Sequence, residues 1–185
     1  MNASSPGLRA GIWACVILLV VLAAALFVRG MGRVADVRTP QTSGSVAVGD
    51  PLPDVRLQTL AGSPITLREF AGHPVWVNFF ATWCQPCKAE LPEIERRYRD
   101  LHGTGLVVFG VDQQESAVAV RSFSAHVGLT YPIAIDEGEA ADVFALHTIP
   151  LSVFVDSTGV VRSIHIGQMQ PGEMDDALKT ILPNG

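Results

Sequence analysis

Two cysteines separated by two residues stand directly after an apolar run, and this feature restricts the local structure of the chain more than any other. The run covers residues 75–80, and the cysteines are Cys84 and Cys87, with Pro86 between them. A buried strand that turns into a helix here would place Cys84 at the helix N-terminus, where unpaired amide hydrogens and the helix dipole favour an anion. Pro86 lacks an amide hydrogen and fits the first helical turn without losing a hydrogen bond.

These positions predict different chemistry for the two thiols. A free cysteine titrates at about 8.5, whereas cysteines at helix N-termini or in Cys-x-x-Cys sequences fall to roughly 3.5–7.5. Cys84 is therefore predicted to be an exposed, nucleophilic thiolate, and Cys87 a shielded thiol that resolves a mixed disulfide. The pair predicts a redox site. Half of a structural zinc site is the alternative, but it needs further ligands, and the remaining cysteine, Cys15, lies in an apolar segment.

A long apolar segment lies near the amino terminus. Residues 10–28 carry no charge and are almost wholly aliphatic, close to the roughly 20 residues that span a bilayer. We predict one transmembrane anchor here, after a short tail at residues 1–9. A cleaved signal peptide is the alternative, because residues 23–25 are small alanines after an apolar core, but the apolar stretch continues beyond them.

The charges around this segment conflict with the orientation that the cysteines favour. Arg29, Arg33 and Arg38 follow the segment, while Arg9 and the amino terminus precede it, so the positive-inside rule would keep the rest of the chain in the cytoplasm. Asp36 partly offsets this bias, and a tethered dithiol makes most chemical sense where disulfides persist. We therefore expect a single-pass cell-membrane protein with its catalytic domain on the extracytoplasmic side.

A polar linker and one acidic domain make up the remaining chain. Residues 29–47 include a turn-forming stretch without periodicity and predict a flexible tether, and the domain is predicted over residues 48–185. Residues 51–185 carry nine Lys or Arg against sixteen Asp or Glu, a formal charge of −7. We therefore expect no nucleic-acid partner.

Apolar runs and helical periodicity alternate within this domain. Strands are expected at residues 55–60, 64–67, 75–80, 106–111, 131–135, 151–155 and 160–166. Helices are expected after Cys84, around Val120, Phe123 and Val127, at residues 139–147, and from Pro171 onward. Strands that alternate with helices and close with a hairpin predict an α/β fold with a mixed sheet.

The stretch of residues 75–92 resembles, nearly throughout, the signature of the TlpA/ResA-like family of membrane-anchored thiol-disulfide oxidoreductases. The resemblance covers roughly residues 48–182. It implies a thioredoxin-like fold, in which helices flank a mixed central sheet. It also implies two additions to plain thioredoxin, an N-terminal β-hairpin at residues 57–67 and a helix-strand insertion at residues 115–135.

The resemblance also implies which residues meet the substrate. Residues 148–150 resemble the cis-proline loop of this fold, so Ile149 would offer its backbone to a substrate strand and the bond before Pro150 would be cis. An ordinary turn proline is the alternative. Trp83 and Pro86 are expected to contact the substrate beside the cysteines. No cofactor or metal is expected, because the five histidines lack ligand spacing.

Glu90 is the candidate for proton transfer. Thioredoxin itself has a buried aspartate six residues before its first active cysteine, and this chain has Asn78 there, which cannot shuttle a proton. Glu90 lies three residues after Cys87 and has no basic residue three or four positions away, unlike Glu93 and Glu95. Partial burial beside the thiols would raise its pKa and suit it to exchange protons. A solvated glutamate is the alternative.

Together these features predict a monomeric, extracytoplasmic protein disulfide reductase. Its expected partners are a disulfide-bearing protein, a membrane thiol-disulfide electron donor, and the lipid bilayer through residues 10–28. The resemblance implies cytochrome c maturation, with the Cys-x-x-Cys-His motif of an apocytochrome c as substrate; copper-site assembly proteins are equally accessible to this chemistry.

Two other functions are alternatives. A thiol peroxidase would need the peroxiredoxin pattern Pro-x3-Thr-x2-Cys, but Ala81 stands three residues before Cys84, and Pro74 is the nearest upstream proline. A copper(I) metallochaperone would hold the soft ion between the two thiolates. The direction of electron flow depends on a reduction potential that residue identities do not fix.

Overall fold

The structure is a computed structural model that describes residues 46–182. The predicted tail, the predicted anchor and most of the predicted linker lie outside the described residues. Within residues 46–182, no helix combines the length and the apolar character needed to cross a membrane.

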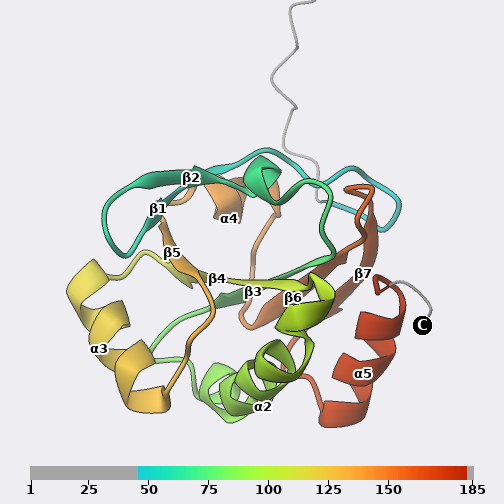
Figure 1. Cartoon of the computed structure of the whole chain (residues 1–185). Coiled ribbons are helices and arrows are strands. Elements are labelled where there is room, and N and C mark those ends of the chain that lie inside the picture. Colours follow the sequence, from blue (N-terminus) through green and yellow to red (C-terminus); the bar gives the residue numbers. More distant parts are fainter. Residues whose placement is uncertain (1–45, 183–185) are drawn as a thin grey trace, which may run out of the picture. The chain divides into compact units, whose positions relative to one another are not determined.

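The described residues form a seven-stranded mixed sheet in the order β2-β1-β5-β4-β3-β6-β7 (Figure 1). The strands are β1 (Arg56–Thr59), β2 (Pro64–Thr66), β3 (Val75–Phe80), β4 (Val107–Gln113), β5 (Ile133–Asp136), β6 (Leu151–Val155) and β7 (Val161–Ile166). β3, β4 and β5 run parallel, and the remaining neighbours pair antiparallel. The predicted hairpins, β1–β2 and β6–β7, and the predicted mixed sheet are confirmed.

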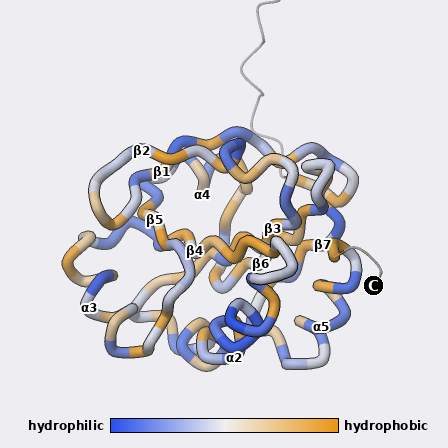
Figure 2. The backbone as a smooth tube through the Cα atoms, viewed as in Figure 1, coloured by the Kyte–Doolittle hydropathy of each residue, from blue (hydrophilic) through white to orange (hydrophobic). Residues whose placement is uncertain are grey.

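Helices and turns cover both faces of this sheet (Figure 1). One face carries α2 (Gln85–Leu101), α3 (Ala117–Val127) and α5 (Pro171–Lys179), with the 3-10 turn η2 (His102–Thr104) continuing α2. The other carries the 3-10 turn η1 (Leu67–Phe70) and α4 (Glu139–Val143), and the β1–β2 edge of the sheet curls toward this side. The central strands are the most hydrophobic part of the domain, as expected for a sheet buried on both sides (Figure 2).

The side chains of β3 alternate between the two faces of the sheet, and this alternation determines which of them face the redox helix α2. All six of its residues are buried. Trp76 and Phe80 belong to the core cluster that contains residues of α2 and α5, whereas Val77 and Phe79 belong to the cluster on the α4 side. Because successive strand residues point to opposite faces, Asn78 lies on the α2 side.

Some predicted boundaries are wrong. α4 ends at Val143 instead of residue 147, because Phe144 leaves the helix and its ring packs 4.9 Å from that of Phe79. The next residue, Ala145, has a φ of +47°, which the helix cannot continue. β4 extends to Gln113, two residues beyond the predicted end, and this extension brings Asp112 into register with Phe80.

Candidate active site

The two predicted cysteines meet at the N-terminus of α2. Cys84 is the N-cap residue, and its Sγ accepts the backbone N–H of Cys87 at 3.2 Å. The two sulfurs form a disulfide, with Cα atoms 5.3 Å apart, so the structure is that of the oxidised form. Cys87 is wholly buried, as predicted.

The loop before β6 lies against Cys84. The Ile149–Pro150 peptide bond is cis, which confirms the prediction, and the carbonyl oxygen of Ile149 lies 3.9 Å from Cys84 Sγ. The predicted exposure of Cys84 is wrong for this disulfide form: the residue is only 4% exposed, because the proline loop and the apolar core close around it. Its chain neighbour Trp83 is 65% exposed, and Pro86 is exposed as well.

Glu90 is buried one turn after Cys87, with 1% of its surface exposed, so the alternative of a solvated glutamate is wrong. Its Oε1 accepts a hydrogen bond from Asn78 Nδ2 at 3.0 Å, and its Oε2 accepts the backbone N–H of Met169 at 2.8 Å. Burial raises the pKa of Glu90 to about 7, although the bonds from Met169 and Asn78 act in the opposite direction. A carboxyl with this pKa holds or releases a proton readily at neutral pH.

Asn78 joins Glu90 to the sheet, a role that the sequence analysis missed. Its Nδ2 also lies 3.3 Å from Ser152 Oγ, which accepts the indole N–H of Trp76 at 2.9 Å. The other amide atom, Oδ1, is buried and has no hydrogen-bond partner among the described residues. A half-turn of the amide would present Oδ1 to Glu90, so the side chain of Asn78 can match either the ionised or the protonated carboxyl.

A second acidic group, also missed, adjoins the loop that carries Cys84. Glu115 follows β4, and its carboxylate accepts both the backbone N–H and the hydroxyl of Thr82. Asp112, at the end of β4, is fully buried. The sequence signal for this group was an aspartate directly after a continuous apolar run.

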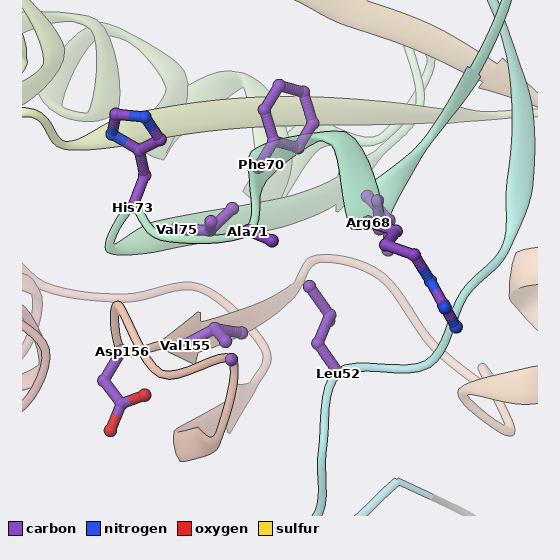
Figure 3. Close-up of a pocket in the computed structure, with 10 residues that line it drawn as sticks. Leu52, Arg68, Phe70, Ala71, His73, Val75, Val155 and Asp156 are labelled. Carbon is purple, nitrogen blue, oxygen red and sulfur yellow. The ribbon is translucent and has the colours of Figure 1, made fainter.

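A cavity of about 210 Å³ lies at the other end of β3 from the disulfide (Figure 3). Leu52, Val75 and Val155 face it, while the charged ends of Arg68 and Asp156 point away from it and form ion pairs elsewhere. Because Val75 begins β3 and the cysteines follow the end of this strand, the cavity is not part of the redox site.

No group of three or more His, Cys, Asp or Glu side chains within residues 46–182 comes together in a way that could hold a metal ion. His147, three residues before Pro150, is exposed.

Comparisons with known proteins agree with this geometry. The profile of the AhpC/TSA family matches residues 48–164. The thiol-disulfide oxidoreductase ResA of Bacillus thuringiensis (strain Al Hakam) is 30% identical over 91% of this chain and 94% of its own length. ResA of Geobacillus thermodenitrificans (strain NG80-2) is 32% identical with the same coverage.

Solved structures show the same fold. A thiol:disulfide interchange protein of the thioredoxin family from Chlorobium tepidum TLS superposes with a TM-score of 0.67 at 26% identity, over 75% of this chain and 100% of that chain. StoA from Bacillus subtilis superposes with a TM-score of 0.59 at 25% identity, over 70% of this chain and 98% of that chain. The predicted thioredoxin-like fold is confirmed.

Proposed function

This chain belongs to the AhpC/TSA family and is a thiol-disulfide oxidoreductase related to ResA, and from this premise we propose that it reduces protein disulfides through Cys84 and Cys87. The observation that carries the proposal is the N-cap position of Cys84, where its sulfur accepts an amide hydrogen beside the cis-proline loop. An amide donor and a helix N-terminus both stabilise a thiolate, and the thiolate is the nucleophile in disulfide exchange.

The reaction runs in two exchange steps. In the reduced protein the Cys84 thiolate attacks one sulfur of the substrate disulfide, so that a mixed disulfide forms and the other substrate sulfur leaves as a thiolate. The Cys87 thiolate then attacks Cys84 Sγ, which forms the disulfide seen in the structure and releases the second substrate thiolate. Two electrons pass from the dithiol to the substrate, and the released thiolates take up protons.

Glu90 would supply the proton exchange for the second step. Cys87 is fully buried, so its thiol needs a nearby base before it can attack. Glu90 is three residues further along α2 and buried, with a pKa raised to about 7 by that burial. Its ionised form would accept the proton of Cys87.

The substrate would bind at the surface around the disulfide. The proposed contacts are exposed Trp83, which offers an aromatic surface, and the Ile149 backbone, which lies beside Cys84, together with exposed Pro86 and buried Pro150. Its substrates would be proteins with accessible disulfides, such as apocytochrome c motifs or copper-site assembly proteins, and a membrane thiol-disulfide protein would regenerate the dithiol.

The cellular placement is part of the proposal. Residues 10–28 would anchor a monomeric protein in the cell membrane, with the domain outside the cytoplasm, where disulfides persist. A reporter that is active only outside the cytoplasm, fused after Gly185, should be active. Activity of a cytoplasmic reporter alone would contradict both the localisation and the maturation role.

The alternative functions gain no support. A peroxidase would need a hydroxyl three residues before Cys84, where Ala81 is buried, and the nearest hydroxyl, of Thr82, donates to Glu115. The copper(I) alternative has no observation in its favour.

Serine substitutions test the roles of the two thiols. Cys84→Ser should abolish the reduction of insulin disulfides, whereas Cys87→Ser should accumulate a mixed disulfide with the substrate that mass spectrometry detects. Cys15→Ser is the matched control and should retain full activity, since Cys15 lies in the apolar segment. Continued turnover in either active-site variant would contradict the proposal.

A further inference from the structure

The loop that carries Cys84 is held by a carboxylate from a distant part of the chain. Glu115 lies between β4 and α3; its Oε2 accepts the backbone N–H of Thr82 at 2.6 Å, and its Oε1 accepts the Thr82 hydroxyl at 2.7 Å. The N–H of Cys84 donates to the carbonyl of Ala81 at 3.1 Å, so residues 81–84 form a hydrogen-bonded turn. A displacement of Thr82 would therefore displace Cys84 as well.

Behind Glu115 lies a second carboxyl, that of Asp112, which is fully buried. Its Oδ1 accepts the backbone N–H of Glu115 at 3.1 Å, and its Oδ2 has no partner among the described residues. A buried carboxylate with one neutral donor is costly, and burial, followed by the adjacent Glu115 carboxyl, raises the pKa of Asp112 to about 8. At neutral pH Asp112 is therefore mostly an uncharged acid.

Glu115 carries the negative charge of this pair. Burial alone would raise its pKa, but the two Thr82 donors, the Asp112 carboxyl and the Lys88 ammonium together lower it. Lys88, on α2, is the cation that acts on Glu115, and the Glu115 carboxylate is the charge that acts on Asp112. The two side chains thus hold one proton and one negative charge between them.

The backbone between them adopts an unfavourable conformation. Gln114 has a φ of +61°, and its N–H donates to the carbonyl of Asp136 in β5 at 3.1 Å. A non-glycine residue with a positive φ is uncommon, and such residues gather at functional sites. Here the conformation bends the chain so that the Glu115 N–H reaches back to Asp112.

We propose that Glu115, whose backbone N–H is held by the buried carboxyl of Asp112, is a positioning residue that holds Thr82 and thereby sets the approach of Cys84 Sγ to a substrate disulfide. The inference rests on the proposed disulfide exchange at Cys84. It is separate from the Glu90 site, because Glu90 hydrogen-bonds to Asn78 and Met169, and neither residue contacts this pair in the hydrogen bonds of the structure.

Exchange of the reduced full-length protein with oxidised glutathione measures this role, because it needs no protein substrate. Glu115→Gln places an amide NH2 against one of the two Thr82 donors and should slow the exchange roughly tenfold. This is a smaller loss of rate than a misplacement of the reacting atoms by about 1 Å can cause. Thr82→Val removes only the hydroxyl and should slow it severalfold, whereas Thr82→Ser keeps both donors and should react like the wild type. Thr82→Val keeps the test open should Glu115→Gln not fold, and a Thr82→Val rate equal to wild type would overturn the proposal.

The pH dependence of the exchange rate of Asp112→Asn distinguishes the positioning role from a purely structural one. Its amide oxygen can still accept the Glu115 N–H, but the side chain cannot ionise. Ionisation of the thiols changes both rates with pH, so its effect cancels in the ratio of wild-type to Asp112→Asn exchange rates. This ratio should be near one at neutral pH and fall as pH rises through about 8, where Asp112 ionises beside Glu115.

If the ratio of wild-type to Asp112→Asn exchange rates stays constant up to about pH 9, the proposal is overturned. If the proposed function is wrong, the result differs. The wild type would exchange with glutathione and show the expected pH dependence of the rate ratio, but it would reduce no protein disulfide. That outcome would contradict protein disulfide reduction and support the positioning role of Glu115.

Discussion

Glu90 and Glu95 lie five residues apart on α2 and are almost equally buried, with 1% and 5% of their surfaces exposed. Their pKa values nevertheless move in opposite directions: burial raises that of Glu90 to about 7, whereas that of Glu95 is lowered. Burial alone therefore does not make a glutamate a proton donor.

The difference lies in the hydrogen-bond donors that reach each carboxylate. Glu90 receives two neutral amide N–H groups, from Asn78 and Met169. Glu95 receives the N–H and the hydroxyl of Thr130 at 2.8 and 2.6 Å, and the guanidinium of Arg99 at 2.6 Å. Three donors, one of them charged, outweigh the cost of burial at Glu95, and two neutral ones do not at Glu90. One carboxylate ties a loop to α2, and the other can exchange a proton.

The largest expected effect is on catalysis at Glu90. General acid–base groups typically contribute roughly 10²–10⁴-fold, so Glu90→Gln should slow insulin reduction about a thousandfold near neutral pH. The wild-type rate should rise with pH through about 7 as Glu90 ionises, and the variant should lack this rise. Stopped-flow measurements across about pH 5 to 9 test this. Superimposable profiles of the two proteins would remove Glu90 from the mechanism.

The second effect is on stability: the contributions of Glu90 and Glu95 to the free energy of unfolding change with pH in opposite directions. The folded-state pKa of Glu90 is raised above the ordinary 4.5, so its contribution to stability is full below 4.5 and is lost as pH rises through about 7. The free energy of unfolding of Glu90→Gln, relative to wild type, should therefore increase by about 3 kcal/mol over that interval. The Glu95 contribution, from a lowered pKa, is present above 4.5 and lost as pH falls.

Urea unfolding of the oxidised proteins at several pH values measures these differences. A relative stability of Glu90→Gln that does not change with pH would show that folding does not raise the pKa of Glu90, and the contrast between the two glutamates would disappear.

Glu95→Gln should act on stability alone. The amide would place an NH2 group against donors, so one or more charge-assisted bonds to Thr130 and Arg99 are lost, at about 2 kcal/mol of unfolding free energy at neutral pH. The reduction rate per folded molecule should equal that of wild type. A loss of rate in the folded variant, with the pH profile of Glu90→Gln, would contradict the division of roles between the two residues.

The sequence predicted this contrast only in part. Glu90 was singled out because no basic residue stands three or four positions away, and Arg99 was visible as the partner of Glu95 one helical turn later. Local spacing could not indicate that Glu95 is buried, since its other partner, Thr130, is 35 positions away. Met169 is 79 positions from Glu90. Such contacts depend on how α2 packs against the rest of the domain.

For the fold, too, local features could be predicted from the sequence, and features that depend on long-range contacts could not. The strands and the redox helix follow from patterns within a few residues, and the cis-proline loop follows from the family resemblance of residues 148–150; these predictions are confirmed. The early end of α4 and the role of Asp112 depend on contacts across the sheet, with Phe79 and Glu115, which periodicity does not show. The anchor at residues 10–28 stays a prediction.

The smallest expected effect separates the charged donor of Glu95 from its neutral ones. Arg99→Met keeps the length of the side chain and removes the cation, and because Arg99 is largely exposed the loss should be at most about 1 kcal/mol. The two bonds from Thr130 remain and lower the pKa of Glu95 more than Arg99 does. Carboxyl carbon NMR should therefore show Glu95 titrating well below Glu90 in this variant. If the two glutamates instead titrate together, the cation alone distinguishes them, and the number of neutral donors does not decide which buried carboxyl can carry a proton.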